Sequence, residues 1–384
     1  MPIDIDKEQM YVNYMIIVNY YELKIIIMET TRAKVNVFVL MRVYNAFKAS
    51  ANAQFLREGI ESFLSQNYEN KELILFDDSS SDGTVELLRE YAAKYNNIYF
   101  TDECCNIKNL GVGRTYVNIS KVALSRAKKE DVIYVLDDDD IYVRRDSLST
   151  IVKKMSETDA DVCFINLRNI GDANVFAKGK KYENQAAVIA ALSELNRAKT
   201  IAELSIIAKA HWGGYSRAYR ARVYDKHIGL IPELTSEHRV HNDLTHISSL
   251  LLRGLRFTAL AEPIYGVRRR TGSVSKSYSR TFFTRGLLFL RTAKDMVLDN
   301  LESHVDGAEM YLQGTMNVFY ADTANRIAKM LKDGVLFDYS EAAFHRDFHE
   351  IVFDNFGRDF GNDREAAFRF IRQAAAVAGV AVVL

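Results

Sequence analysis

The chain has 384 residues, 48% of them hydrophobic, which is enough for one large or two ordinary domains with a well-filled core. Its 50 Lys and Arg residues balance its 50 Asp and Glu residues, so no overall charge attracts nucleic acid or an anionic membrane. The three cysteines are too few for a disulfide framework and lack the Cys-x-x-Cys spacing of zinc sites, which favours a reducing, cytoplasmic location.

The first 33 residues are expected to form an extension outside the fold. Their two apolar segments, at 15–18 and 25–28, are separated by Asn19, Glu22 and Lys24, which is too polar for a membrane span or a signal peptide. Met28 stands just upstream of the first strong strand pattern. A misplaced start, with the native chain beginning there, is therefore a hypothesis.

From residue 35 onward, short apolar segments alternate with helical patterns. We expect strands at 35–41, 73–76, 98–101, 132–136 and 162–167, and helices at 54–66, from residue 84, and at 118–127. Strands that alternate with helices and end in polar residues predict an α/β fold, with a mostly parallel sheet flanked by helices.

The strand expected at 132–136 is followed at once by four consecutive aspartates, Asp137 to Asp140. Ligands of open α/β sheets bind at the carboxyl ends of the strands, so these carboxylates lie where a site is expected. Like charges in a row repel one another unless something positive neutralises them, and oxygen ligands favour Mg²⁺ or Mn²⁺. A solvated acidic turn is the alternative interpretation.

Several separated motifs resemble those of the family 2 glycosyltransferases, in the order and at the spacing of that family. They are Tyr44-Asn45, Asp77-Asp78 with the turn 79–84, Gly111-Val112-Gly113, Asn118, and Leu136 with its four aspartates. The resemblance covers roughly residues 35–275, and the set is specific although each motif alone is weak.

The resemblance implies a domain organisation as well as a fold. Residues 34–281 would form a Rossmann-like GT-A domain, with a nucleotide-binding half at 34–145 and an acceptor-binding half at 146–281. Residues 282–384, where the resemblance ends, have helical periodicity and are expected to form a helical C-terminal region.

The resemblance also implies roles for residues of the first half. The nucleotide would contact Arg42, Tyr44, Asn45, Asp78, Arg114 and Asp138, and the metal would bind Asp137 and Asp139. Asp78 would hydrogen-bond the base, Tyr44 would stack on it, and Asp139 would be the principal metal ligand. Helix N-capping is the alternative for Asp78 and is preferred for Asp82. The arginine that the family often has at position 117 is missing, and Arg114, three residues earlier, would reach the phosphates in its place. The alternative is that Arg114 is a solvated loop residue.

Asp243 matches the aspartate that serves the family as general base, although Asn242 stands where a glutamate is more common. An inverting transfer needs one carboxylate to take the proton of the acceptor hydroxyl. Three nearby histidines, at 238, 241 and 246, raise the alternative of a zinc site. Their spacing is not the i, i+4 pair of a zinc protease helix, so we do not favour it.

Two further segments resemble ligand-binding loops of the family. The sugar would contact Trp212, Gly213 and Gly214, and the diphosphate would contact Arg268, Arg270, Ser273 and Ser275. An aromatic ring beside two glycines suits a sugar face, and arginines suit phosphate. A core tryptophan and a basic surface loop are the respective alternatives.

The sequence therefore predicts a cytoplasmic, inverting glycosyltransferase assisted by Mn²⁺ or Mg²⁺. We expect a nucleotide-sugar donor, with UDP first among the nucleotides, and a glycan or lipid-linked glycan acceptor in bacterial surface polysaccharide synthesis. Peripheral membrane association and a homo-oligomer through the C-terminal helices are further expectations. The alternatives are a degenerate transferase domain that binds glycan or scaffolds an assembly, and a nucleotidyltransferase.

Overall fold

The computed structural model describes residues 34–48, 50–170, 216–228 and 255–268, together with the single residues 365 and 369. The strands are β1 (Val37–Val43), β2 (Lys71–Asp77), β3 (Ile98–Tyr99), β4 (Val132–Val135), β5 (Ile141–Tyr142), β6 (Val162–Ile170), β7 (Arg217–Arg220) and β8 (Phe257–Arg268). The helices are α2 (Ser50–Leu64), α3 (Thr84–Lys94), the short 3₁₀ helix η1 (Asp102–Cys104), α4 (Val112–Arg126), α5 (Ser147–Glu157) and α8 (Ala221–Ile228).

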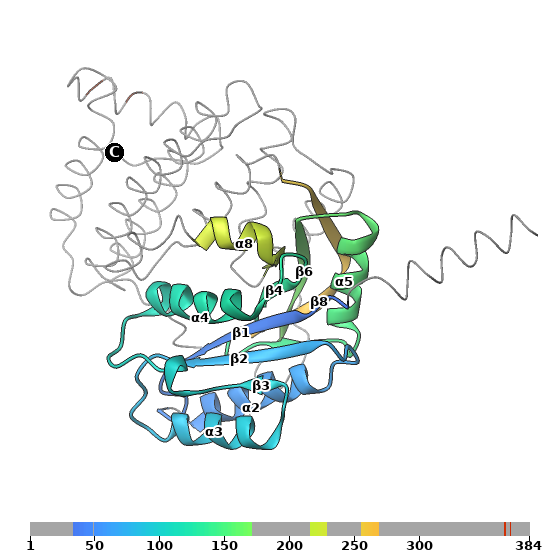
Figure 1. The fold of residues 1–384 in the computed structure, drawn as a ribbon. Coiled ribbons are helices and arrows are strands. Elements are labelled where there is room, and N and C mark those ends of the chain that lie inside the picture. Colours follow the sequence, from blue (N-terminus) through green and yellow to red (C-terminus); the bar gives the residue numbers. More distant parts are fainter. Residues whose placement is uncertain are drawn as a thin grey trace, which may run out of the picture.

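Within these ranges the strands form one sheet of eight, in the order β3-β2-β1-β4-β7-β6-β8-β5 (Figure 1). Strand β1 pairs in parallel with both β2 and β4, and β2 pairs in parallel with β3. The carboxyl ends of β1, β2 and β4 therefore meet at one edge of the sheet. This half agrees with the parallel arrangement that the sequence predicts.

The other half of the sheet is mixed. Strand β7 runs antiparallel to both β4 and β6, and β5 runs antiparallel to β8, whereas β6 and β8 are parallel. The predicted fold class is confirmed, since four of the seven strand pairings in the described ranges are parallel, but the three antiparallel pairings all involve strands of this second half. An apolar run in the sequence indicates a buried strand but does not encode the direction of its neighbour, so this difference was not foreseeable from periodicity.

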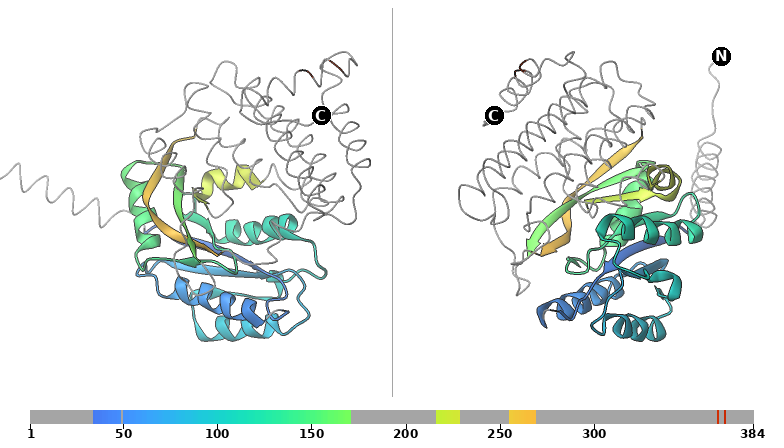
Figure 2. Two further views of the ribbon diagram at one scale, coloured as in Figure 1. Left: turned by 180° about the vertical axis from the view of Figure 1, so that it is seen from behind. Right: turned by 90° about the vertical axis from the view of Figure 1, so that its left-hand side faces the viewer.

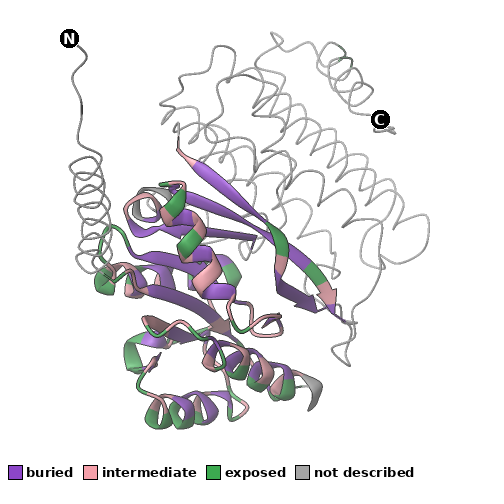
Figure 3. Ribbon diagram, turned by 90° about the vertical axis from the view of Figure 1, so that its right-hand side faces the viewer, coloured by how far each residue is buried: buried purple, intermediate pink, exposed green. Residues whose placement is uncertain are grey.

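Helices cover both faces of the parallel half. In two opposite views α4 lies on one face of β1 and β2, and α2 and α3 lie on the other (Figure 1 and Figure 2). The central strands are almost wholly buried, whereas the helices expose one side to solvent (Figure 3). Residues 37–41 of β1 are apolar on both faces, as a strand between two helical layers requires.

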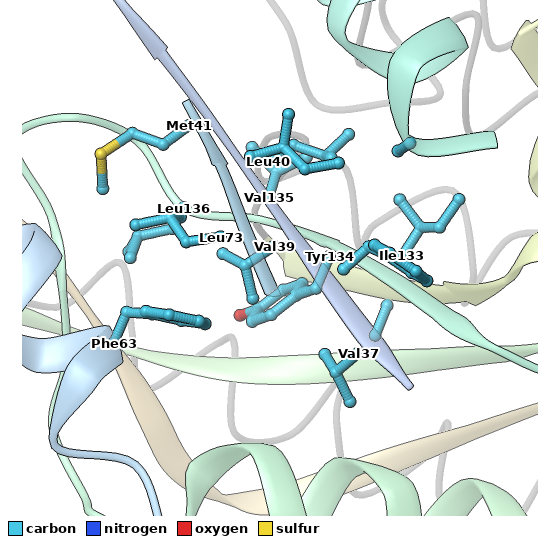
Figure 4. Packing of buried hydrophobic residues seen from close by; sticks show 14 of the residues in the cluster. Val37, Val39, Leu40, Met41, Phe63, Leu73, Ile133, Tyr134, Val135 and Leu136 are labelled. Carbon is cyan, nitrogen blue, oxygen red and sulfur yellow. The ribbon is translucent and has the colours of Figure 1, made fainter. Parts of the chain in front are cut away.

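The core is continuous across the sheet. Val39 of β1, Leu73 of β2, Tyr134 of β4 and Phe63 of α2 belong to one cluster of buried side chains (Figure 4). Burial of this kind stabilises by about 25 cal/mol per Å² of apolar surface removed from water, so these strands form a rigid base for the loops at their carboxyl ends.

Helix α4 begins at Val112, six residues before the helix predicted at 118–127. Glycines at 111 and 113 weaken the helical pattern there, because glycine is a poor helix former. Gly111 has φ of 80°, a left-handed conformation that favours glycine, and its backbone N–H donates to Asp78. A tertiary contact therefore sets the start of the helix.

No helix within the described ranges is long and apolar enough to cross a membrane. The N-terminal extension at 1–33 lies outside the described residues. So does the C-terminal region at 282–384, apart from residues 365 and 369. The expectations for both segments remain predictions.

The glycine at 266 lets β8 pass close to its neighbours. A Cβ atom there would lie 2.8 Å from Val143 Cγ1 and 3.3 Å from both Ile141 Cγ1 and Ile170 Cδ1. Valine and isoleucine are stiff at χ1, so they do not move away easily. Gly266→Ala should therefore lower the free energy of unfolding by about 1–3 kcal/mol, measured by urea denaturation. Ala261→Ser, at an exposed position of the same strand, is the control, and equal stability of the two variants would contradict the prediction.

Candidate active site

Three parallel strands deliver polar residues to the same edge of the sheet. Val43, at the end of β1, is in register with Asp77, at the end of β2, and Leu40 of β1 is in register with Val135, at the end of β4. The residues that follow these strands are therefore neighbours. One contact shows this directly, since Arg42 Nη2 lies 3.3 Å from Asp137 Oδ1.

The four aspartates 137–140 form a closed turn, which we call the acidic turn. The backbone N–H of Asp140 donates to the carbonyl of Asp137 at 3.1 Å. Tyr265 of β8 ties the two ends together, because its hydroxyl accepts from Asp137 N at 3.0 Å and donates to Asp140 Oδ2 at 2.9 Å. Arg268 N donates to Asp140 Oδ1 at 2.7 Å. The conformation of the turn is thus fixed from inside the domain.

The carboxylates of the acidic turn have different surroundings. Asp140 is buried, whereas Asp137, Asp138 and Asp139 are partly exposed. Burial raises the pKa of Asp140 well above its usual range, and the nearby carboxylates of Asp139 and Asp137 raise it further. Asp140 therefore anchors the turn, and the three residues before it supply the carboxylates at the surface.

Arginines already neutralise part of this charge. Arg42 pairs with Asp137 and also donates to the carbonyl of Val112 at 2.8 Å, with its guanidinium 5.4 Å from the centre of the Tyr116 ring. Arg268 Nε donates to the carbonyl of Asp139 at 2.8 Å. The sequence pattern assigns the whole of this neutralisation to a metal ion, whereas in the structure two arginines share it.

The acidic turn has the chemistry of a cation site in which the protein supplies only one or two ligands. Among the described residues, no group of three or more His, Cys, Asp or Glu side chains is arranged to hold a metal ion. Mg²⁺ and Mn²⁺ are commonly bound by one or two carboxylates, with waters and substrate phosphates completing the coordination. The partly exposed Asp137 and Asp139 fit such a shared site, and they do not form a closed protein cage.

Asp78 lies buried beside the start of α4. Its carboxylate accepts from Asn106 Nδ2 at 2.7 Å, from Leu110 N at 2.8 Å and from Gly111 N at 2.9 Å. A carboxylate has about four lone-pair positions, so one remains for a further donor such as a base N–H. The N-cap of α3 is Gly83, without a side-chain cap. Asp78 therefore does not cap α3, and it anchors the loop that leads into α4.

The loops after β1 and β2 are joined to each other. Asn45 has φ of 48°, donates its N–H to Ser80 Oγ at 2.8 Å and accepts from Ser81 N at 2.9 Å. Asp82 accepts from Phe47 N at 2.8 Å and from Thr84 N at 3.3 Å, so it joins the β1 loop to the first residue of α3. The N-cap of α3 is Gly83, so the helix N-cap preferred for Asp82 is wrong. Tyr44, with 48% of its surface exposed, projects from a loop held in place by these contacts.

Arg114 is exposed in the first turn of α4, where a cation can reach a bound anion at the helix N-terminus.

Arg268 does not lie in an exposed basic loop, which was the alternative considered for it. Its side chain is 0% exposed and pairs with Glu58 of α2 at 2.7 Å. Its contact with a diphosphate stays a prediction.

The acceptor side of the predicted site lies outside the described residues. The positions concerned are Trp212, Gly213, Gly214, Asp243, Arg270, Ser273 and Ser275. Of the histidines considered for zinc, none falls within the described ranges either. The predictions for all of these residues stand untested.

Sequence reasoning missed three residues of the site, namely Glu58, Asn106 and Tyr265. Each binds a predicted site residue from a distant part of the chain, so no local pattern marks it. The one available signal is Glu58, a charged residue three positions after Phe55 on the apolar side of α2. Such a charge needs a partner, although the sequence does not say which.

Comparisons with known proteins bear on the family of the chain. Residues 38–224 match the family model "Glycosyl transferase family 2". The putative glycosyltransferase EpsE of Bacillus subtilis is 48% identical over 61 residues, which are 16% of this chain and 20% of EpsE. Glycosyltransferase GlyG of Streptococcus pneumoniae is 24% identical over 277 residues, which are 70% of this chain and 82% of GlyG.

A solved structure extends the likeness to the fold. The crystal structure of S. aureus TarS 1-349 has a TM-score of 0.56 at 16% identity, over 89% of this chain and 88% of that chain. The matched family segment includes the ends of β1, β2 and β4, where the candidate site lies. The chain therefore carries a GT-A domain of glycosyl transferase family 2 and is a glycosyltransferase.

Proposed function

We propose that this enzyme transfers a sugar, with inversion, from a nucleotide-sugar donor to a hydroxyl of a glycan or lipid-linked glycan. UDP is the nucleotide we test first, and Mn²⁺ or Mg²⁺ is the cofactor. The observation that carries the proposal is the meeting of three strand ends at one sheet edge, which brings Tyr44, Asp78 and the acidic turn together. Ligands of such sheets bind at that edge.

The donor would lie across the loops after β1 and β2. Asp78 has one lone-pair position left for a base N–H, and the exposed ring of Tyr44 offers a face for stacking. Arg42 and Asn45 would border the base, with Asp138 beside the ribose and diphosphate. Arg114 and the N-terminus of α4 favour the phosphates, because the helix dipole and the unpaired N–H groups attract anions.

The diphosphate must leave with a negative charge that the site stabilises. A divalent cation held by Asp137 and Asp139 would supply this stabilisation when bound. In the part of the chain that the structure does not describe, Arg270, Ser273 and Ser275 would bind the same diphosphate. Trp212, Gly213 and Gly214 would bind the sugar.

Transfer would proceed by a single displacement. Asp243 takes the proton of the acceptor hydroxyl as the oxygen forms a bond to the anomeric carbon. The bond from that carbon to the phosphate oxygen breaks at the same time, and the diphosphate leaves with the bonding electron pair. Attack opposite the leaving group inverts the anomeric configuration.

The cellular setting is also a proposal. Relatives in Bacillus and Streptococcus support a bacterial enzyme, for which we propose a role in surface polysaccharide synthesis. All three cysteines are unpaired, which fits a reducing cytoplasm. Burial raises the pKa of Cys105 to about 11, so this thiol is not a nucleophile at neutral pH. A peripheral position at the membrane and a homo-oligomer through residues 282–384 complete the proposal.

A metal-dependent nucleotide site should be visible in thermal unfolding. We expect one of UDP, GDP, CDP and dTDP to raise the melting temperature, with a larger effect when Mn²⁺ is present. A ligand at 100 times its dissociation constant adds about 2.7 kcal/mol to the folded state, which is a clear shift. Asp139→Asn should lose the part of the shift that depends on Mn²⁺. Asp102→Asn, at an exposed carboxylate far from the turn in sequence, should keep it.

The same screen can refute the proposal. If no nucleotide shifts the melting temperature of the wild type, the donor site is absent. If Asp139→Asn responds to Mn²⁺ as the wild type does, the acidic turn is not the metal site.

The general base can be separated from donor binding. Asp243→Asn removes the proton acceptor but keeps the side chain's size, so transfer should fall by about 10²- to 10⁴-fold. The melting shift with nucleotide and Mn²⁺ should be unchanged. Release of the nucleoside diphosphate in the presence of a bacterial glycan measures transfer, with Asn242→Ala as the neighbouring control. Full activity in Asp243→Asn would remove this role from Asp243.

Asp78 should matter for stability as well as for the base. Asparagine at this position turns an NH₂ group toward N–H donors that the carboxylate now accepts. Hydrogen bonds to charged groups contribute roughly 1.5–3 kcal/mol each, so Asp78→Asn should lower the unfolding free energy by at least about that amount. Urea denaturation measures the loss. Asp102→Asn should show no measurable change, and wild-type stability in Asp78→Asn would contradict the anchoring role.

A further inference from the structure

The acidic turn rests on residues to which the proposed function gives no part in metal binding. Arg268, at the end of β8, makes two separate contacts with it. Its Nε donates to the carbonyl of Asp139 at 2.8 Å, and its backbone N–H donates to Asp140 Oδ1 at 2.7 Å. One residue thereby fixes the peptide plane after Asp139 and the carboxylate of the next residue.

Glu58 of α2 is the counter-ion of this arginine. Arg268 Nη2 lies 2.7 Å from Glu58 Oε2, and its guanidinium carbon lies 4.0 Å from the centre of the Phe55 ring. The side chain of Arg268 is 0% exposed and that of Glu58 is 25% exposed. A buried guanidinium needs such a partner, because water cannot solvate its charge.

Helix α2 also lies directly against the turn. A Cβ atom on Gly59 would come within 3.0 Å of the carbonyl oxygen of Asp140 and within 3.3 Å of Met41 Cε. A Cβ atom there would require its neighbours to shift by a few tenths of an ångström, and backbone shifts less readily than a flexible side chain, so glycine favours this close approach. Glu58 is therefore presented from a rigid element that touches the turn it supports.

We propose that Glu58 is a positioning residue, which acts through Arg268 to hold the Asp139 carboxylate in the geometry that binds the metal. The inference rests on the proposed function of Asp139. Two effects act together. The Glu58–Arg268 pair fixes the backbone of Asp139, and the Glu58 charge keeps the guanidinium from competing with the cation for the aspartates.

A purely structural ion pair would behave differently. Its loss would lower the melting temperature, but the folded protein would bind the metal as before. Metal affinity, measured below the melting transition, therefore separates positioning from stabilisation.

The test measures Mn²⁺ binding with UDP present, from the electron paramagnetic resonance signal of free Mn²⁺. Glu58→Gln keeps the shape of the side chain and removes its charge. Residues that orient metal ligands typically contribute 10- to 100-fold to affinity, so we expect binding about 10-fold weaker. Binding of UDP without metal, followed by thermal unfolding, should not change.

Glu61→Gln is the matched control. It removes the same charge from the same helix. Glu61 Oε1 accepts from the Tyr91 hydroxyl of α3 at 3.1 Å and takes no part in the Glu58–Arg268 pair. Mn²⁺ affinity should equal that of the wild type. Arg268→Lys is a second variant, which keeps the positive charge and loses the planar fork that reaches Glu58 and the Asp139 carbonyl together. Arg268→Lys should also weaken Mn²⁺ binding. If Glu58→Gln unfolds below the assay temperature, Arg268→Lys is the variant that tests the proposal.

Two failures are distinguishable. If the wild type binds no Mn²⁺ with UDP, the proposed metal site fails and this inference falls with it. If the wild type binds Mn²⁺ and the Glu58 and Arg268 variants bind it equally well, the metal site stands and the positioning role is overturned. A lower melting temperature with unchanged Mn²⁺ affinity overturns the positioning role in the same way.

Discussion

The charge of four adjacent aspartates at the end of a buried strand is the constraint around which the rest of the site is built. Strand β4 is fully buried, and the four carboxylates that follow it at once repel one another. The carboxylates have different surroundings, which reduces this repulsion. Asp140 is held inside by Tyr265 and Arg268, Asp137 pairs with Arg42, and Asp138 and Asp139 stay partly exposed.

This division depends on the topology of the sheet. The parallel pairing of β1 with β2 and β4 gathers Arg42, Asp78 and Asp137 at one edge. Strand β8, from much later in the chain, contacts the acidic turn through Tyr265 and Arg268 and fixes its conformation. The loops at this edge are thus held by a rigid frame, which fixes their conformation while part of the acidic turn stays exposed.

The sequence predicted much of the frame. The main strands and helices from 35 to 136, the acidic strand ends and the family motifs all follow from local patterns, and the comparisons confirm the family and the GT-A fold. Strand β5 and helix α5 were not predicted. Some details differ from the expectations. Helix α4 starts at Val112 because Asp78 binds the backbone of Gly111, and the later half of the sheet is mixed. Arg268 is buried where a surface loop was considered.

The sequence by itself determined most of the elements that form and the motifs that indicate the family, because apolar periodicity and motif spacing are properties of neighbouring residues. The tertiary structure alone decided how the carboxylates are neutralised. Arg42 meets Asp137 across 95 positions, and Arg268 meets Glu58 across 210. Such pairs depend on how strands and helices pack against one another, so no local pattern predicts them.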